Sequence, residues 1–296
     1  MTDPGGDLGL DHPLVTVRDR ERALEAFGRL GFAPAPVTYH PWGTWTALVV
    51  LQRDLIELIG VHDQAAVEAE TKADGFGFGA YIREFLARAE GVSLLALHSD
   101  DIEADAGHLA RGGVPITRRI DFRRAVTLPD GVADEAKVSL LILYDPGMPE
   151  ASQFVCQQHR PHCIWQPAWQ RHPNGAVGLA ELVYLAAPGD DRLRGRLAAL
   201  YGERALRGDA EDLAAQTGNG VLRVMSEGRA RARFGTLPDR QGRPAAVAIG
   251  VRVTDLEVAR AILEANDVPH QRTVEGRLRV DPAAACNVII EFWQAG

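Results

Sequence analysis

The stretch Leu10-Asp11-His12-Pro13-Leu14-Val15-Thr16-Val17 begins a pattern that decides the fold of this chain. The β-branched residues Val15 and Val17 favour an extended strand. An amphipathic helix is expected from Asp19, a good N-cap residue, to Gly31, a good C-cap residue. Further strands are predicted near 34–40, 44–51 and 54–60. The unit is therefore one strand, one helix and two or three strands.

The same unit recurs three more times along the chain. In the second copy we expect a first strand at 92–98, a helix from 101 to 112, and later strands at 138–143 and 153–157. In the third copy the first strand is expected at 179–185, the helix at 192–201 and the closing strand at 221–225. In the fourth copy they are expected at 246–253, 256–265 and 287–292. Four related units imply duplication. They predict an α+β fold rather than a parallel doubly wound sheet.

Two kinds of connecting segment interrupt the repeats. A spacer at about 63–90 has helical character that is broken at the glycine-rich stretch 75–79, and a similar spacer carries 229–234. The stretch 160–176 contains three prolines and is the best candidate for a domain boundary. We therefore predict an N-terminal domain over 9–160 and a C-terminal domain over 177–296.

The composition restricts the class of protein. The 296 residues carry a formal net charge of -8, which gives no electrostatic reason to bind nucleic acid or an anionic membrane. The arginines are scattered among acidic residues and indicate no ligand. The N-terminus lacks the features of a signal peptide, no segment is apolar enough to span a membrane, and the three cysteines form no C-x-x-C pair. A cytoplasmic protein, a monomer or homodimer acting on a small molecule, is expected.

His12 and Glu57 place metal-capable side chains in otherwise apolar strands. Alternation puts Leu55, Glu57 and Ile59 on one face of a strand, and a carboxylate on an apolar face needs a partner because an unpaired buried charge is costly. Two interpretations remain open from these residues alone. Either the two side chains share a metal ion, or His12 is a hydrogen-bonded core histidine and Glu57 lies at a wet sheet surface.

Several short motifs resemble one known family. They are Asp11-His12, the helix end Leu30-Gly31-Phe32, His40 followed by Gly43-Thr44, and Glu57-Leu58-Ile59-Gly60. Together with the four units, they resemble the glyoxalase-like branch of the vicinal oxygen chelate superfamily, which includes glyoxalase I, extradiol dioxygenases and bleomycin-resistance proteins. The resemblance implies βαβββ modules that close in pairs into cupped sheets around a pocket. It also implies a divalent metal held by a His or Glu on a module's first strand and a Glu on its last.

Under this resemblance the ligand positions are only partly filled. His12 and Glu57 match the first module. In the second module the first-strand position is Leu94, with His98 near the strand end, and the last strand offers Cys156, Gln157 and, just beyond, His159. The third module has Glu181 on its first strand and either Arg223 or Met225 on its last. The fourth has Ala248 on its first strand and Glu291 on its last. No consecutive pair of modules shows four ligands.

The third ligand depends on how the modules pair. Sequential pairing, which we favour because it needs no long crossing connection, points to Gln157 or His159. Pairing of the first module with the fourth brings Glu291 to His12 and Glu57. One imidazole and two carboxylates suit Fe²⁺, Mn²⁺, Ni²⁺ or Zn²⁺.

The implied chemistry is stabilisation of an oxyanion on a substrate that chelates the metal through two oxygens. Glu57 is a ligand and a possible base, and His40 is a second catalytic candidate. The predicted pocket residues are Trp42, Trp45, Gln157 and Trp165. The first two of these are also compatible with packing on the sheet.

The cluster from Cys156 to Cys163, with His159 and His162 between them, does not have the spacing of a zinc finger or knuckle, and we do not predict a zinc site there. Two classes of function remain. One is a metal-dependent lyase, isomerase or ring-cleaving dioxygenase. The other is a metal-free binding protein of the drug-sequestration kind. In both, we expect the main pocket in the N-terminal half, where His12, His40 and Glu57 gather.

Overall fold

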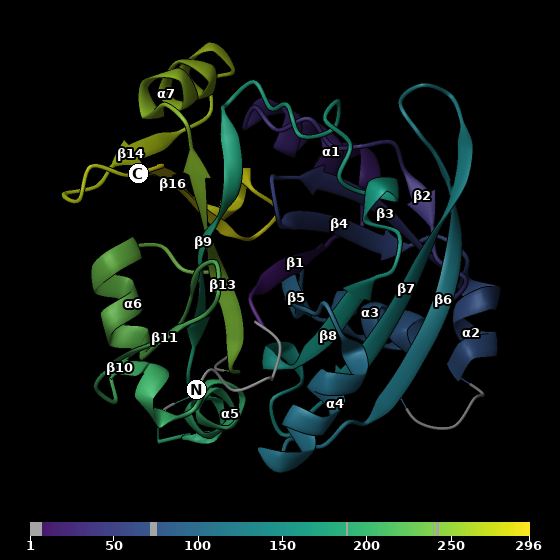
Figure 1. Ribbon diagram of the computed structural model, residues 1–296. Helices are drawn as coiled ribbons and strands as arrows, with labels where there is room; N and C mark the ends of the chain where they lie inside the picture. The colour runs from purple at the N-terminus through teal and green to yellow at the C-terminus, as the bar shows by residue number, and fades with distance from the viewer. Residues whose placement is uncertain (1–7, 72–75, 188, 239, 241–242) are drawn as a thin grey trace.

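The computed structural model describes residues 8–71, 76–187, 189–238, 240 and 243–296. It contains two eight-stranded sheets, one from each half of the chain, which lie side by side (Figure 1). The expected lack of a signal peptide rests on residues 1–7, which lie outside the described residues.

The first sheet has the strand order β2-β3-β4-β1-β5-β8-β7-β6. Its strands are β1 (Leu10–Thr16), β2 (Thr38–Tyr39), β3 (Thr44–Val50), β4 (Leu55–Val61), β5 (Gly91–His98), β6 (Arg118–Thr127), β7 (Ala133–Leu143) and β8 (Gln153–Gln158). β1 and β5 are antiparallel neighbours at the centre, and each is flanked by the parallel last strand of its own module. The end strands β2 and β6 also contact each other, so the sheet curls into a cup.

The second sheet repeats this plan in the order β10-β11-β12-β9-β13-β16-β15-β14. Its strands are β9 (Ala176–Leu185), β10 (Leu206–Gly208), β11 (Asp212–Gln216), β12 (Val221–Met225), β13 (Ala245–Val253), β14 (His270–Arg272), β15 (Leu278–Val280) and β16 (Ile289–Gln294). The α+β prediction of four modules is confirmed, and the modules pair sequentially, first with second and third with fourth. The strand expected at 34–40 is shorter than predicted, because Pro34 and Pro36 lack the N–H groups that a ladder needs.

The module helices are α1 (Arg20–Arg29), α4 (Ile102–Arg111), α5 (Arg192–Tyr201) and α7 (Leu256–Ala265). Asp19 caps α1 by accepting a hydrogen bond from the Arg22 N–H. Gly31, with φ +82°, follows the helix end as predicted, and a Cβ there would lie 2.7 Å from an Ile262 methyl group. This glycine therefore serves both the turn and the packing of the two halves.

The spacers form helices that cover the sheets. The first gives α2 (Gln64–Thr71) and α3 (Phe78–Leu86), and the other gives α6 (Glu227–Phe234). The predicted break at 75–79 falls between α2 and α3, although residue 75 lies outside the described residues and Phe78 and Gly79 already belong to α3. Four short 3-10 turns, Pro149–Ala151, Pro161–Cys163, Glu203–Ala205 and Pro282–Ala284, complete the elements.

The largest apolar core lies between the two halves. It joins side chains of both sheets and their helices, and Phe32 stacks on Phe292 with ring centroids 5.8 Å apart. Asn219, from the second half, exchanges two hydrogen bonds with the backbone of Leu10 at the start of β1, at 2.7 and 2.8 Å. The second half therefore supports the strand that carries His12. The domain limits 9–160 and 177–296 stay a prediction, since one core spans both.

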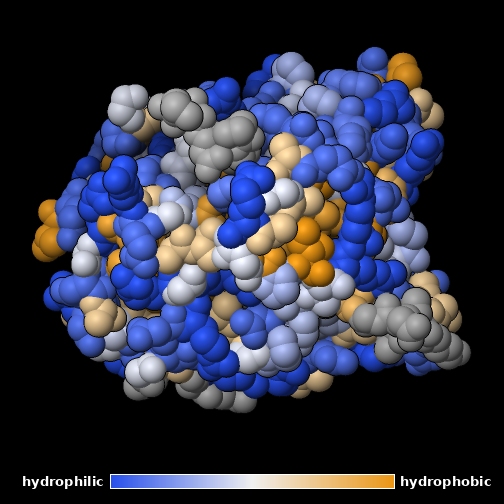
Figure 2. All heavy atoms as spheres, turned by 60° about the horizontal axis from the view of Figure 1, so that its bottom comes forward, coloured by the Kyte–Doolittle hydropathy of each residue, from blue (hydrophilic) through white to orange (hydrophobic). Residues whose placement is uncertain are grey.

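The face shown in Figure 2 is largely hydrophilic, with a hydrophobic area near its middle. No helix in the described part of the chain is both long and apolar enough to cross a membrane.

Candidate metal site in the first cup

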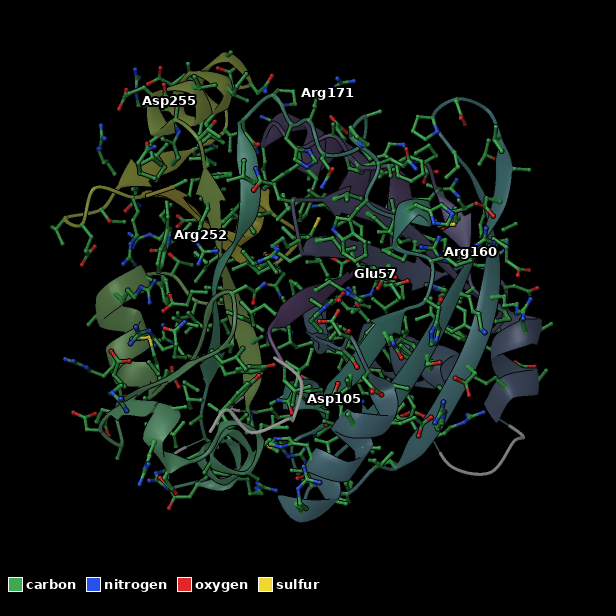
Figure 3. The ribbon with its side chains drawn as sticks, viewed as in Figure 1. Glu57, Asp105, Arg160, Arg171, Arg252 and Asp255 are labelled. Carbon is green, nitrogen blue, oxygen red and sulfur yellow. The ribbon has the colours of Figure 1, made fainter. Side chains whose placement is uncertain are left out.

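His12 and Glu57 lie side by side inside the first sheet. Their strands β1 and β4 are parallel neighbours with Leu14 opposite Glu57. His12 Nε2 lies 3.3 Å from Glu57 Oε2, and each residue is only 6% exposed. Glu57 is drawn among the strands of the first sheet, whereas Arg252 lies in the second (Figure 3). The two side chains thus share one buried space.

Asp11 holds the other face of the His12 ring. Its fully buried carboxylate contacts His12 Nδ1, and its second oxygen lies 3.2 Å from His98 Nδ1. His98 Nε2 in turn lies 3.1 Å from the exposed carboxylate of Asp100. Because Asp11 occupies Nδ1, the Nε2 atom of His12 is the nitrogen that faces Glu57.

The charges of this cluster are strongly coupled. Burial lowers the pKa of His12, but the neighbouring Asp11 and Glu57 outweigh it and raise the pKa to about 9. Burial likewise raises the pKa of Glu57, but the hydrogen bond from His12 and the electrostatic influence of the neighbouring His40 and His12 imidazoles lower it to about 2. When no metal ion is bound, protonated His12 and ionised Glu57 therefore form an ion pair.

His40 approaches the same carboxylate from the other side. Its Nε2 lies 3.9 Å from Glu57 Oε1, and its Nδ1 lies 2.9 Å from Thr44 Oγ1. Burial lowers the pKa of His40 to about 4, so the imidazole is neutral. The ring stacks on Trp42 with centroids 4.7 Å apart. Thus two imidazoles, each with Nδ1 already engaged, aim Nε2 at opposite oxygens of one carboxylate.

A cavity with about 40 Å³ of water-accessible space adjoins these groups. Its walls come from both modules and from α3: His12, His40, Trp42, Leu48, Leu55, Glu57, Phe78, Phe122, Arg124, Val138, Leu140, Phe154, Cys156 and Gln158. A cavity of this size holds a few water molecules or a metal ion with its ligands. The rest of the lining is apolar apart from Arg124 and Gln158.

Several wall residues were not predicted from the sequence, among them three phenylalanines and an arginine. Phe78 comes from the spacer, and Phe154 occupies the second-module position that pairs through Ala96 with His12. Phe122 and Arg124 lie on one face of β6, which alternates between exposed and less exposed residues along 118–127. A charged residue on the apolar face of a strand is the pattern that identified Glu57, and the same pattern could have identified Arg124.

The structure does not bring the other predicted site residues to this cavity. Trp45 points to the opposite face of β3 and joins the main core. Gln157, also on the outer face of its strand, accepts a hydrogen bond from the Ile102 N–H at 3.2 Å. Trp165 lines a separate hollow together with His98. Sheet alternation explains the first two, since side chains one residue apart point to opposite faces.

The two candidates for a third ligand also lie elsewhere. His159 is exposed beyond β8, with Nε2 2.7 Å from Ser139 Oγ. Glu291 belongs to the second sheet, where its Oε2 lies 2.6 Å from Arg233 Nη2 and 3.3 Å from Arg277 Nη1. Sequential pairing separates Glu291 from His12. Of the predicted residues, His40 is the one that joins His12 and Glu57.

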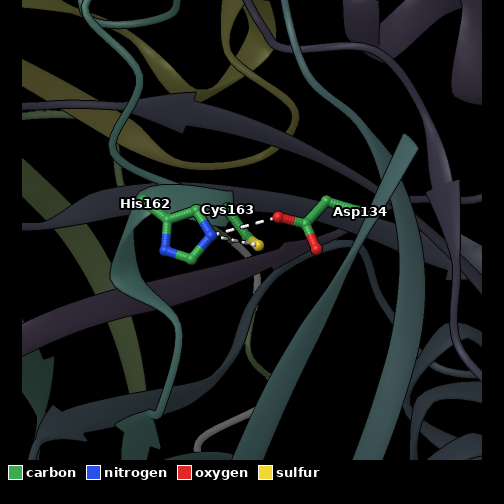
Figure 4. Close-up of side chains that lie close together, drawn as sticks. All are labelled: Asp134, His162 and Cys163. Carbon is green, nitrogen blue, oxygen red and sulfur yellow. Dashed lines mark hydrogen bonds and ion pairs between the residues drawn. The ribbon is translucent and has the colours of Figure 1, made fainter. Parts of the chain in front are cut away.

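Part of the Cys156–Cys163 stretch forms a different cluster. His162 Nε2 lies 3.0 Å from Asp134 Oδ2 and 3.5 Å from Cys163 Sγ (Figure 4). Asp134 is already paired with Arg160 at 2.7 Å, and burial raises the pKa of the Cys163 thiol. Cys156 is not part of it but lines the first cavity.

Comparison with known proteins agrees with this architecture. No curated protein matches the chain in sequence. A hypothetical protein from Staphylococcus aureus matches with a TM-score of 0.64 and 12% identity over 97% of this chain and 99% of its own. A mutant of 4-hydroxymandelate synthase from Streptomyces coelicolor matches with a TM-score of 0.54 and 11% identity over 98% and 93%. A xylose isomerase-like TIM barrel/4-hydroxyphenylpyruvate dioxygenase fusion protein matches with a TM-score of 0.53 and 14% identity, over 99% of this chain and 49% of its own.

At such identities these structures show the fold alone. The model of the glyoxalase-like domain family matches residues 10–201, which include the whole first sheet with His12, His40 and Glu57, and the first strand and helix of the second. The chain therefore belongs to the glyoxalase-like domain family.

Proposed function

We propose that this protein is a metal-dependent enzyme of the vicinal oxygen chelate type, which acts on a small molecule that presents two oxygens to the metal. The observation that carries the proposal is the convergence of His12 Nε2 and His40 Nε2 on the two carboxylate oxygens of Glu57, at 3.3 and 3.9 Å. These three side chains are the proposed metal ligands.

The donor set fits a divalent metal. Ligating histidines usually have their second ring nitrogen hydrogen-bonded, and here Asp11 and Thr44 engage the Nδ1 atoms of His12 and His40. Two imidazoles and one carboxylate are a set that Fe²⁺ uses with further positions open, and Mn²⁺, Ni²⁺ and Zn²⁺ also accept nitrogen and oxygen ligands. His40 takes the third-ligand role proposed from sequence for His159 or Glu291, because of these three described residues it is the one that lies beside Glu57.

A bound metal would act as a Lewis acid toward a chelated substrate. The protein groups do the rest. Asp11 keeps His12 in the orientation that aims Nε2 inward, and Glu57 supplies a carboxylate that can accept a proton at the edge of the site. Phe78, Phe122 and Phe154 exclude water from the reacting end of the substrate.

The reaction class to test first is oxidation with dioxygen. Two solved structures with the same fold are named as a 4-hydroxymandelate synthase and a 4-hydroxyphenylpyruvate dioxygenase fusion, and a site with two histidines and one carboxylate suits iron. Lyase and isomerase reactions, which need the metal only as a Lewis acid, come next.

Metal stoichiometry tests the proposal. Metal-free protein titrated anaerobically with Fe²⁺, and separately with Mn²⁺, Ni²⁺ and Zn²⁺, is expected to bind about one equivalent of at least one of them. The variants His12→Ala, His40→Ala and Glu57→Gln should lose it. His159→Ala and His162→Ala, which change histidines outside the cavity, should keep it. Retention by Glu57→Gln, or loss in His162→Ala, would refute the assignment and move the metal elsewhere.

A second candidate function, metal-free ligand binding, is favoured by one observation. The second module contributes Leu94 and Phe154, rather than ligands, at the positions related to His12 and Glu57. A cup with one polar end and an aromatic wall can hold a ligand by stacking alone. This function is supported if the titration finds no metal bound at Glu57.

A further inference from the structure

Arg124 is a buried cation that the proposed metal site does not use. It lies on β6, is 8% exposed, and lines both the inner cavity and a neighbouring groove. Its Nη1 donates a hydrogen bond to Thr38 Oγ1 on β2. A guanidinium has five N–H donors. Within the described part of the chain, Thr38 is the only group that accepts one of them.

No carboxylate forms an ion pair with Arg124 among the described residues. Burial lowers the pKa of Arg124, and the charge of Glu57 opposes this change across the cavity. Burying a guanidinium without an ion-pair partner costs free energy, because the water that it loses is not replaced. An anion bound next to Arg124 would compensate for that loss.

The groove on the outer side of Arg124 has room for the body of a ligand. It holds about 580 Å³ of water-accessible space, far more than the inner cavity, and the two share Leu48 and Arg124. Its lining is mainly apolar: Ala35, Pro36, Val37, Thr38, Tyr39, Leu48, Ala125, Val126, Thr127, Leu128, Pro129, Cys163, Ile164 and Trp169. Arg124 is the one charged side chain in this lining.

We propose that Arg124 binds a carboxylate group of the substrate, whose apolar or aromatic body lies in the groove between β2 and β6. It rests on the proposed function in one respect, namely that a separate pair of substrate oxygens reaches the metal at Glu57. The substrate class is then an apolar carboxylic acid that carries a chelating pair of oxygens at its other end.

A carboxylate fits better than a phosphate. One guanidinium fork matches the two oxygens of a planar carboxylate. A phosphate ester carries nearly two negative charges, and the groove offers no second cation to neutralise them. The apolar lining also disfavours a strongly hydrated group.

Arg124 also has a structural interpretation, since its contact with Thr38 joins the two end strands of the first sheet. A purely structural arginine would not distinguish an anionic ligand from a neutral ligand of the same shape. The experiment therefore compares two such probes.

The probes are 3-phenylpropionate and its neutral isostere 3-phenylpropionamide. Binding to the full chain is measured by calorimetry, and by the fluorescence of Trp42 and Trp169 beside the two hollows, in the presence of a chelator so that no metal contributes. The carboxylate is expected to bind about ten-fold more tightly than the amide or better, the size of one charge-assisted bidentate contact. Equal affinities, or tighter binding of phenyl phosphate, would overturn the proposal.

The variants locate the effect. Arg124→Met replaces the buried charge by an apolar side chain of similar length, which preserves packing, and should abolish the preference for the carboxylate. Arg124→Lys, which keeps the charge without the fork, should retain part of it. Arg123→Gln is the matched control, because Arg123 is exposed on the opposite face of β6 and pairs with Glu135 at 3.0 Å.

Failure of this proposal can be told apart from failure of the proposed function. An unchanged preference in Arg124→Met refutes the carboxylate site even if one metal binds at Glu57. A lost preference supports the carboxylate site even if no metal binds. Thermal unfolding of each variant checks that the fold is retained, and if Arg124→Met does not fold, Arg124→Lys decides, since an undiminished preference in it would refute recognition by the fork.

Discussion

The two cupped sheets place different side chains at equivalent positions. In the first, Leu14 pairs with Glu57 on one side and Leu94 on the other. In the second, Val183 takes the place of Leu14 and pairs with Arg223 and Ala248. By the same register, Glu181 takes the place of His12 and Glu291 that of Phe154.

The interior of the second cup contains ion pairs beside an apolar cluster that includes Val183, Phe234 and Ala248. Arg233, on α6, lies 2.7 Å from Glu181 and 2.6 Å from Glu291. Arg223 lies 2.6 Å from Glu181, and Arg277 lies 3.3 Å from Glu291. Both carboxylates are almost fully buried. Three guanidinium groups thus surround the two acids.

The two cups differ in whether their cationic side chains can lose a proton and become metal ligands. An imidazole loses its proton readily and then offers a lone pair to a metal, whereas a guanidinium stays protonated and offers none. Under the proposed function a metal would replace a proton in the first cup, whereas in the second it would have to displace whole arginine side chains. One scaffold therefore forms an open site in one half and a closed ion-pair cluster in the other.

The largest expected effect is on the closed cup. Arg233→Ala removes the cation that bridges Glu181 and Glu291 and leaves two buried carboxylates short of partners. The free energy of unfolding should fall by about 3–5 kcal/mol, as measured by urea denaturation.

The matched control for this change is Arg231→Ala on the same helix. Arg231 is exposed and pairs with Glu227 four residues earlier, so its loss should cost only about 0.5 kcal/mol. If both variants lose equally little, the second cup is not held together by its ion pairs, and the contrast with the first cup weakens.

Asp11 offers a second test of the difference between the cups. Its carboxylate orients His12 in the first cup, whereas the described cluster of the second cup pairs its carboxylates with arginines. Asp11→Asn preserves shape but removes the charge that orients His12. Metal affinity should fall by about 10- to 100-fold, the usual effect of losing such a partner. Asp100→Asn, at the exposed end of the same chain of contacts, should change it little. Equal effects of the two variants in a metal titration would contradict the orienting role.

The modules were predictable from sequence because their signals are local. Asp19 and Asp101 cap helices where expected, and alternation around Glu57 marked the strand face that the cavity uses. The family resemblance marked Glu291 as a ligand position in the same way, but a buried carboxylate indicates only that it needs a partner. Whether that partner is a metal ion or Arg233 depends on the α6 spacer, which packs through tertiary contacts.

Two of the remaining site residues lacked a periodic signal, and the signal of a third was obscured. His40 lies between β2 and β3 in a turn, where neither helical nor strand periodicity applies, so its approach to Glu57 follows only from the folded loop. Phe78 belongs to a helix outside the repeated unit. Arg124 had the strand-face signal, but it was hidden among many arginines.

A smaller effect is expected at the connector that joins the two cups. His172 Nδ1 accepts a hydrogen bond from the Ala33 N–H at 3.1 Å, and its Nε2 donates one to the Val50 carbonyl at 2.9 Å. Only a neutral imidazole makes both bonds. Loss of both in His172→Ala should cost about 1–2 kcal/mol at pH about 8.

The pH dependence of this connector has a definite sign. Burial lowers the pKa of His172 below its usual 6.5. The unfolded chain then binds more protons below pH 6.5, so this contribution to stability is present above that pH and is lost as the pH falls. His172→Gln, whose amide can accept and donate in the same way but does not titrate, should flatten the fall between about pH 7 and 5. An unchanged slope in denaturation measurements would place the titrating group elsewhere.

The smallest predicted effect separates the two imidazoles of the open cup. His40 is oriented by the neutral hydroxyl of Thr44 at 2.9 Å, whereas His12 is oriented by a carboxylate. A neutral hydrogen bond contributes about 1 kcal/mol, roughly half as much as one to a charged group. Thr44→Val, which keeps the β-branched shape in a fully buried position, should therefore weaken metal binding only about five-fold. Thr127→Val, at the exposed end of β6, is the matched control and should not change it. If Thr44→Val weakens metal binding as much as Asp11→Asn does, the hydroxyl holds the turn as well as the ring, and the ranking of the two contacts is wrong.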